Sequence, residues 1–222
     1  MFALVIRLSN CAGFHSLTIN SVGRLTGFNI GVSVFMGTKG EGNRQRIVEA
    51  ADNLFYRRGY NQTSFQDISE ATGIPRGNFY YYFKTKDEIL AAVVNTRVAD
   101  LTNMLNRCES QTQNARERLL LFSNMLAHNL DAVIEVGCPI GSLSSELAKG
   151  DPGLHEKSRQ GFVVLRAWIK QQFEALGLSD ADDLAMDLLA KLQGTTVMAC
   201  AFKDIDYIKR SHQQIKNWIN EK

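Results

Sequence analysis

The sequence predicts an all-α protein, and three observations carry this prediction. Apolar residues after Met36 recur every three or four positions, which is the spacing of one helix face. The 222 residues include only 3 prolines, and no alternating apolar run of useful length indicates a strand. Residues 63–86 have the pattern of a helix, a tight turn and a second helix. With 45% hydrophobic content, the chain can bury a sizeable core in one or two domains.

The composition changes at Met36. The residues before it contain no acidic side chain and only two basic ones, Arg7 and Arg24. Residues 2–6 are apolar, but this run is shorter than the ~7–15-residue core of a signal peptide. We therefore expect Met36 to be the working start and residues 1–36 to be a non-native or disordered extension. The alternative is a genuine N-terminal arm.

Three short helices are predicted next. Gly59 is expected to end the first as a left-handed cap. Thr63, with Gln66 three residues later, matches a capping box and predicts the start of the second helix. Gly73 predicts the turn after it, and Pro75 suits the first position of the third helix, where its missing N–H costs nothing. The inward face of the first helix is formed by Ile47, Ala50, Ala51, Leu54 and Phe55.

The rest of the chain also has helical periodicity. Phe79 and Phe83 form the buried face of the third helix, and Thr85 can cap a long helix over residues 86–108. The break at residues 137–139 separates two predicted helices. The helices expected after residue 108 cover residues 115–136, 142–149 and 154–176, then a segment that begins with Leu184, Leu188 and Leu192, and residues 205–219.

The stretch from Arg44 to Leu90 carries an ordered set of motifs. It contains Ile47-Val-Glu-Ala-Ala-Asp-Asn-Leu-Phe, Gly59-Tyr60, Thr63, Asp67-Ile68, Ala71-Thr-Gly-Ile and Asn78-Phe-Tyr-Tyr-Tyr-Phe-Lys-Thr-Lys-Asp-Glu-Ile-Leu. This pattern resembles the TetR/AcrR family of bacterial transcription regulators. It departs at Ile74-Pro75, where the family usually has Val-Ser. The resemblance implies a helix-turn-helix DNA-binding domain over residues 37–86 and a helical regulatory and dimerisation domain over residues 87–222.

The charge distribution agrees with this division. Residues 37–86 carry a net charge of +3, whereas residues 87–222 carry −3. This distribution fits a mildly basic N-terminal domain, called the head, that binds DNA, and an acidic C-terminal domain, called the body, that has a different function. The resemblance implies a repressor that a small molecule releases from its operator. An activator is the alternative.

The resemblance also implies which side chains of the third helix lie at or near DNA: Arg76, Gly77, Asn78, Tyr80, Tyr81 and Tyr82. The residue chemistry agrees. Arg76 can bond to guanine O6 and N7, and Asn78 can pair with adenine N6 and N7. Gly77 lets the helix backbone approach closely. The tyrosines offer hydroxyls to phosphates and rings to thymine methyls, and one of the three is expected to point partly inward.

A second set of DNA contacts is expected at two helix N-termini. Thr63, Ser64 and Gln66 begin the second helix, where free N–H groups and the helix dipole attract phosphate. We expect Thr63 both to cap this helix and to touch phosphate. Lys86 resembles the phosphate-contacting lysine of the family, with an ordinary solvated charge as the alternative. Arg44 and Arg46 are each either a phosphate contact or part of a solvated helix face.

The body is expected to hold a pocket for a small molecule between its central helices. Residues of these types at helical spacing are more often core, so only a minority should line it. The candidates are Met104, Phe122, Met125, Phe162, Trp168, Ile169, Phe173, Gln193 and Met198.

A homodimer is expected to form through the last two long helices, packed as a four-helix bundle across the two-fold axis. The last helix carries an apolar stripe that it cannot hide alone, formed by Ile205, Ile208, Ile215 and Ile219. The facing stripe is expected to be Leu184, Leu188 and Leu192. His212 lies on the seam as an interface or packing residue.

Cys138 lies at a helix break before Pro139. A thiol there could sense oxidants or electrophiles, which makes a thiol-based regulator an alternative function. The competing interpretation is a buried small apolar residue.

Several classes of protein are disfavoured. The 4 cysteines form no CxxC pair and no histidine cluster accompanies them, which argues against a zinc site or disulfide scaffold and suits a reducing cytoplasm. No segment reaches the ~18 apolar residues of a membrane helix. Glycine-rich phosphate loops, paired carboxylates and Ser–His or Cys–His motifs are absent, so we expect no enzyme. We expect no cofactor; the expected partners are double-stranded DNA, a second copy and a small-molecule effector.

Overall fold

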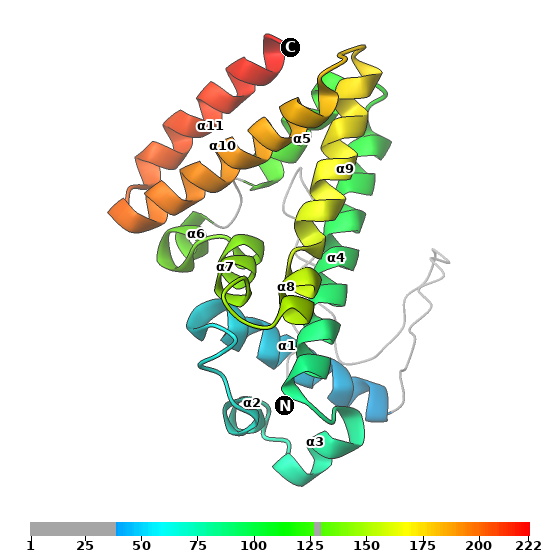
Figure 1. Ribbon diagram of the computed structural model, residues 1–222, viewed down its shortest axis with the longest axis vertical. Helices are drawn as coiled ribbons and strands as arrows, with labels where there is room; N and C mark the ends of the chain where they lie inside the picture. Colours follow the sequence, from blue (N-terminus) through cyan, green and yellow to red (C-terminus); the bar gives the residue numbers. More distant parts are fainter. Residues whose placement is uncertain (1–38, 127–129) are drawn as a thin grey trace, which may run out of the picture. The chain divides into compact units, whose positions relative to one another are not determined.

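The computed structural model describes residues 39–126 and 130–222, with side chains described for residues 42–124 and 130–222. The expected extension over residues 1–36 lies outside these ranges. Every regular element within them is a helix, which confirms the predicted all-α class (Figure 1). None of the described helices is both long and apolar enough to cross a membrane. The helices are α1 (Lys39–Arg58), α2 (Phe65–Thr72), α3 (Arg76–Tyr82), α4 (Lys86–Gln111), α5 (Ala115–Leu126), α6 (Leu130–Val136), α7 (Pro139–Leu147), α8 (Pro152–Ser158), α9 (Gln160–Ala175), α10 (Ala181–Phe202) and α11 (Ile205–Asn220).

Two glycines end helices where the sequence predicts it. Gly59 follows α1 with φ +89°, and its N–H donates to the carbonyl of Phe55 at 3.1 Å. Gly73 follows α2 with φ +66°, and its N–H donates to the carbonyl of Ser69 at 2.9 Å. Only glycine adopts this left-handed conformation at little cost. The predicted cap at Gly59 and the predicted turn at Gly73 are both confirmed.

The predicted start of α2 is wrong by one residue. Ser64 is the N-cap, and its hydroxyl accepts a hydrogen bond from the N–H of Asp67. The Asp67 carboxylate accepts from the N–H of Ser64 at 2.7 Å, which completes a capping box. Thr63 and Gln66 have the same spacing but do not form the box. Pro75 is likewise the N-cap of α3 instead of its first helical residue.

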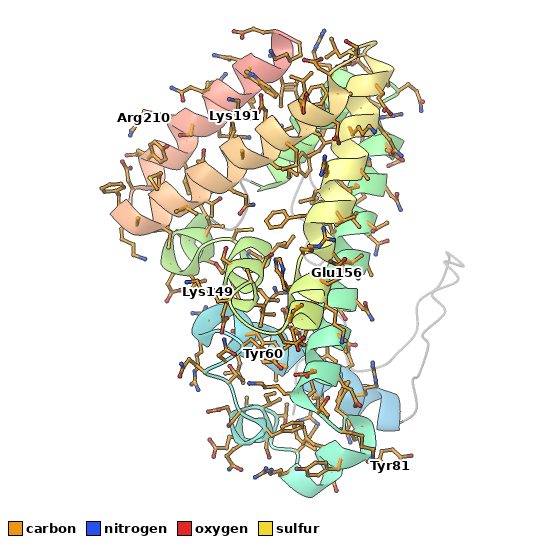
Figure 2. All side chains as sticks on the ribbon, viewed as in Figure 1. Tyr60, Tyr81, Lys149, Glu156, Lys191 and Arg210 are labelled. Atoms are coloured by element: carbon orange, nitrogen blue, oxygen red, sulfur yellow. The ribbon has the colours of Figure 1, made fainter. Side chains whose placement is uncertain are left out.

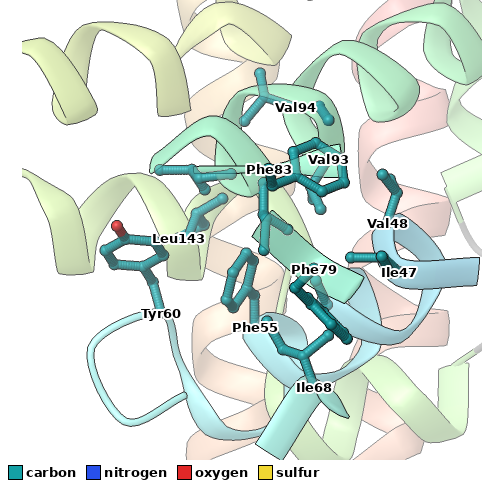
Figure 3. Packing of buried hydrophobic residues seen from close by; sticks show 14 of the residues in the cluster. Ile47, Val48, Phe55, Tyr60, Ile68, Phe79, Phe83, Val93, Val94 and Leu143 are labelled. Carbon is teal, nitrogen blue, oxygen red and sulfur yellow. The ribbon is translucent and has the colours of Figure 1, made fainter. Parts of the chain in front are cut away.

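The first hydrophobic cluster, called the head core, joins α1, α2 and α3 to the first part of α4 (Figure 3). Phe79 of α3 is fully buried within it, and Phe83 is buried beside it. Both side chains therefore fix α3 on the head, as the sequence predicts. The cluster also includes Leu143 and Leu147 of α7. Its larger members are Ile47, Val48, Phe55, Tyr60, Ile68, Phe79, Phe83, Ile89, Leu90, Val93 and Val94.

Helix α4 contributes to two cores. Its first half adds Ile89 and Val93 to the head core, and its second half adds Leu101 and Leu105 to a second cluster, called the body core. Thr85 caps the helix as predicted, because its hydroxyl accepts from the N–H of Glu88 at 3.1 Å. The helix ends at Gln111, one turn later than predicted.

The predicted helices of the body differ from the observed ones at several boundaries. The described residues of the helix expected over residues 115–136 lie in α5, up to Leu126, and in α6, from Leu130, and residues 127–129 are not described. The long helix expected over residues 154–176 is divided, because α8 ends at Ser158 and α9 begins at Gln160. Asp151 caps α8 by accepting from the N–H of Leu154 at 3.0 Å. The helix predicted over residues 142–149 begins three residues earlier, at Pro139.

The apolar stripe of α11 packs inside its own chain, so its expected role at the dimer seam is wrong. Ile208, Ile215 and Ile219 are 6%, 4% and 0% exposed, and Ile215 and Ile219 belong to the body core. The stripe expected to face it, which includes Leu184 and Leu188, is buried in the same core. Helix α11 packs on α10, α5 and α6. The amphipathic pattern correctly predicted burial, but the surface that buries it is intramolecular.

Candidate nucleic-acid interface

The N-terminal half of α3 presents an exposed polar surface. Arg76, Gly77 and Asn78 are all exposed, and Tyr81 is 81% exposed. Figure 2 shows Tyr81 at the end of the head, on the α3 segment. Because residues three and four apart share a helix face, Tyr81 lies on the same face as Gly77 and Asn78. A Cβ added at Gly77 would meet no atom of this chain within 4 Å, so the space beside it is open.

The other two tyrosines of α3 are tied to the head. Tyr80 is 45% exposed and stacks on Phe65 of α2, with ring centroids 6.0 Å apart. Tyr82 is the one that lies partly inward, and its hydroxyl accepts a hydrogen bond from Asn43 at 3.4 Å. Tyr81 and Tyr82 also meet edge to face. The three tyrosines therefore differ: Tyr81 is available to a partner, Tyr80 offers one face, and Tyr82 is largely structural.

The turn between α2 and α3 is held by hydrogen bonds that the sequence did not reveal. The guanidinium of Arg46, on α1, donates to the carbonyl of Thr72 at 2.6 Å. Ser69 donates through its hydroxyl to the carbonyl of Ile74 at 2.7 Å, and the Thr72 hydroxyl accepts from the Ile74 N–H at 3.2 Å. These bonds fix the angle between the two helices. Arg46 thus stabilises this turn, and this role is independent of any contact with phosphate.

The N-terminus of α2 is exposed and partly occupied by an acid. Hydrogen bonds from the Ser64 side chain and backbone lower the pKa of Asp67, and Arg58 lies 3.3 Å from the same carboxylate. The N–H groups of Phe65 and Gln66 have no partner within the helix, because they belong to its first turn. An anion could bind there, although Asp67 already occupies part of the terminus.

Thr63 and Lys86 are engaged inside the chain. Thr63 is 1% exposed, and its hydroxyl donates to the carbonyl of Gly59 at 2.8 Å. The ammonium of Lys86 donates to the carbonyls of Tyr60 and Thr63 at 3.0 and 3.1 Å. Burial lowers the pKa of Lys86, and the carboxylates of Asp87 and Glu146 oppose that shift. Lys86 is therefore a half-buried positioning group here, and an ordinary solvated charge does not describe it.

Several polar contacts join the head to the body. Arg97 of α4 binds Asp52 of α1 at 2.6 Å, and it also donates to the carbonyl of Pro139 at 2.8 Å. The hydroxyl of Tyr56 donates to the carbonyl of Gly137 at 2.7 Å. Burial is the largest cause that raises the pKa of Tyr56, so the hydroxyl stays a donor at neutral pH. The segment before α7 is thus bonded to α1.

Most of the predicted effector-binding residues lie in the packed body core. Phe122, Ile169 and Phe173 are fully buried, and Trp168 is 7% exposed and donates to Glu109 at 2.8 Å. Met104 and Phe162 pack against the same cluster, whereas the side chain of Met125 lies outside the described residues. Gln193 is half-buried on α10. Met198 differs from the others, because it is 41% exposed and lines a groove of about 480 Å³ between α10 and α11.

Cys138 is the N-cap of α7. Its sulfur accepts from the N–H of Gly141 and from the side-chain amide of Gln193, both at 3.4 Å. The thiol is half-buried, so the interpretation as a fully buried apolar residue does not hold. Among the side chains that the structure describes, no three His, Cys, Asp or Glu residues are grouped so that they could hold a metal ion.

Two family models match separate parts of the chain. Residues 47–93, which contain α2, α3 and most residues of the head core, match the model described as bacterial regulatory proteins of the tetR family. Residues 115–214 match the LmrA/YxaF-like C-terminal domain of transcriptional regulators. The two matches together cover the exposed α3 surface and most of the body.

Curated relatives and solved structures agree with these models. An uncharacterised HTH-type transcriptional regulator of Lactococcus lactis is 30% identical over 181 residues, which are 78% of this chain and 91% of that protein. The HTH-type transcriptional repressor DhaR of a Mycobacterium species is 29% identical over 154 residues, 66% of this chain and 74% of that protein. A crystal structure of a TetR transcriptional regulator from Chloroflexus aurantiacus has a TM-score of 0.74 at 23% identity, and the match covers 83% of this chain and 97% of that chain. The chain therefore belongs to the TetR family and is a DNA-binding transcriptional regulator of the helix-turn-helix type.

Proposed function

We propose that the protein is a homodimeric repressor that leaves its operator when a small molecule binds the body. The observation that carries this proposal is the position of α4 in both the head core and the body core. A change in body packing must move the second half of α4 or strain it. A continuous helix then passes that displacement to the head, because its hydrogen-bonded backbone bends little.

The proposed DNA contacts lie on the exposed face of the head. Arg76 and Asn78 bind base edges, and Tyr80 and Tyr81 contact a thymine methyl or a phosphate. Gly77 has no side chain, so the backbone of α3 can approach the DNA closely. The first turn of α2, with Ser64 and Gln66, binds phosphate. Thr63, Tyr82 and Lys86 support this surface from inside the head, as their hydrogen bonds indicate.

The proposed dimer face is the outer side of α10 and α11. Val197, Met198 and Phe202 are 56%, 41% and 77% exposed, which is unusual for side chains of this size. Met198 also lines the groove that α10 forms with α11. Gly194 lies in that groove, and a Cβ there would meet nothing within 4 Å, so a partner helix can approach closely. A second copy, related by a two-fold axis, would cover this face with the same residues.

Release by an effector requires two conformations with different affinities for DNA. Two heads in a dimer bind half-sites about one helical turn or more apart. An effector that binds more tightly to a conformation with a different head spacing shifts the population away from the DNA-binding one. A difference of about 1–3 kcal/mol is a typical coupling free energy for such a device.

The test begins with a duplex selected from a random library by the full chain. Small hydrophobic and cationic compounds are then screened by thermal shift, since a ligand raises the melting temperature of the state that it binds. At least one stabilising compound should weaken binding to the selected duplex. Stabilising compounds that all leave the duplex affinity unchanged would contradict release by an effector. A reporter with the duplex inside its promoter separates repression, which lowers expression, from activation.

Thiol sensing through Cys138 is a second candidate. The observation in its favour is that two N–H donors hold the sulfur at the N-terminus of α7, whose other end contacts the head. Treatment with an electrophile should then release the duplex from the wild-type protein but not from the Cys138→Ser variant. Equal release from both proteins would exclude this mechanism.

A further inference from the structure

The carboxylate of Glu146, on α7, binds the backbone of the loop between α1 and α2. One oxygen accepts from the N–H of Tyr60 at 2.9 Å, and the other accepts from the N–H of Asn61 at 2.7 Å. Figure 3 shows Tyr60 extending from this loop. Hydrogen bonds to an ionised acceptor are the stronger class, so both N–H groups are well fixed. The loop is therefore bonded to a helix of the body.

Gly59 provides the room for this carboxylate. A Cβ at Gly59 would lie 2.9 Å from one Glu146 oxygen and 3.1 Å from the other. Gly59 also has φ +89°, so the same residue turns the backbone and exposes the two following N–H groups. The close approach and the two bonds belong to one arrangement of backbone and side chain.

The carbonyl side of the same loop is held by α4. Lys86 donates to the carbonyls of Tyr60 and Thr63, so the loop lies between an anion from α7 and a cation from α4. The loop leads directly into Ser64, the N-cap of α2. The position of the N-terminus of α2 thus depends on both side chains.

We infer that Glu146 is a positioning residue for DNA binding, through which α7 fixes the start of α2 on the body. The inference rests on the proposed contact between the first turn of α2 and phosphate. Loss of Glu146 frees the loop, and DNA must then order that loop when it binds, which lowers the affinity.

An exposed ion pair gives a matched control. Arg57 and Glu135 also join α1 to the body, at 3.2 Å, but their side chains are 53% and 61% exposed. Such pairs contribute little because water and salt screen them. Glu135→Gln therefore removes a head-to-body carboxylate without freeing a backbone N–H group. Glu146→Gln removes the charge and leaves one acceptor oxygen for two N–H groups.

Amide hydrogen exchange of the full chain, measured by NMR, tests the local role. In Glu146→Gln, exchange at Tyr60 and Asn61 should rise about tenfold or more, while the Gly73 amide in the same head stays protected. Glu146→Asp, which keeps the charge, should restore part of the protection, and it takes the place of the glutamine variant if that one unfolds. Unchanged exchange at Tyr60 and Asn61 would overturn the inference.

Affinity for the selected duplex tests the functional role. Glu146→Gln should bind about tenfold more weakly, with an unchanged salt dependence, because no phosphate contact is removed. Glu135→Gln should bind normally. Faster loop exchange with unchanged affinity would refute the positioning role. The duplex affinity of Arg76→Ala is measured in parallel. If α3 does not contact the DNA, the affinity of this variant stays unchanged, whereas the amide exchange data of Glu146→Gln are not affected.

Discussion

The ammonium of Lys86 lies 4.1 Å from the ring centroid of Tyr60 and donates to the backbone carbonyl of the same residue at 3.0 Å. The cation thus binds both the ring face and the backbone of one residue at the start of the α1–α2 loop. Removing it would leave two carbonyls without their charged donor and the ring face uncovered. Lys86, the first residue of α4, therefore helps to stabilise the folded head.

Lys86→Met should therefore destabilise the protein, although methionine preserves most of the side-chain volume. We expect the free energy of unfolding to fall by about 1–3 kcal/mol, the usual cost of leaving a charged group's partners unsatisfied. Lys84→Met is the control, because Lys84 is exposed and should change stability by less than about 0.5 kcal/mol. Urea denaturation of both variants measures the difference. Equal stabilities would show that Lys86 is an ordinary surface charge.

The dimer should depend on the exposed residues of α10. Met198→Glu combined with Phe202→Glu places two charges in the proposed interface without partners, so the protein should become monomeric and remain folded. Val163→Glu changes an equally apolar side chain on α9 that is 49% exposed, and it should stay dimeric. Sedimentation velocity and circular dichroism report the two properties. A double variant that remains dimeric would place the interface elsewhere.

A chain that begins at Met36 should fold, dimerise and bind the selected duplex like the full chain. The composition changes at this methionine, and contacts group residues 37–222 into one unit. Side-by-side titrations of the two chains, together with their sedimentation, measure the comparison. Loss of solubility or of duplex binding on truncation would give residues 1–35 a structural role.

Stability should fall on mild acidification because of His212. Burial lowers the pKa of His212, and Lys216 lowers it further, against an opposing hydrogen bond with the Ser123 backbone. The Nε2 atom is buried, and no group of the described residues forms a hydrogen bond with it. The unfolded state thus binds the proton more readily, so this stability is present above the ordinary pKa of about 6.5 and is lost as pH falls below it.

His212→Asn should flatten the dependence of the melting temperature on pH between neutrality and about pH 5. His155→Asn, which alters a half-buried histidine on α8, is measured beside it as the control. Parallel slopes for the wild type and His212→Asn would mean that another group controls the acid response.

The sequence predicted the elements of the head well because each of them depends on local signals. Gly59 and Gly73 require a left-handed conformation, and Thr85 precedes a long apolar pattern. The choice between Thr63 and Ser64 as the cap was not predictable, because Gln66 and Asp67 give both residues a partner at the same spacing. Only the side-chain directions of the folded loop distinguish them.

Tertiary contacts account for the other differences. The stripe of isoleucines on α11 predicts burial, but its periodicity cannot tell whether the covering surface comes from the same chain or a second one. The partners of Lys86 and Glu146 are backbone groups of one loop, 23 to 86 residues away in the sequence, and no motif joins them. The break at Arg159 between α8 and α9 contains neither glycine nor proline, so no local signal indicated it.

The proposed function depends most on base recognition by α3 through Arg76. The most direct measurement is the base preference of the full chain and of Arg76→Ala, each determined by selection from a random duplex library and followed by binding titrations. We predict paired half-sites for the wild type, and for Arg76→Ala a loss of about 1–3 kcal/mol with relaxed preference at one position of each half-site, in a dimer that remains folded. Unchanged affinity and unchanged preference at every position would contradict this role of Arg76.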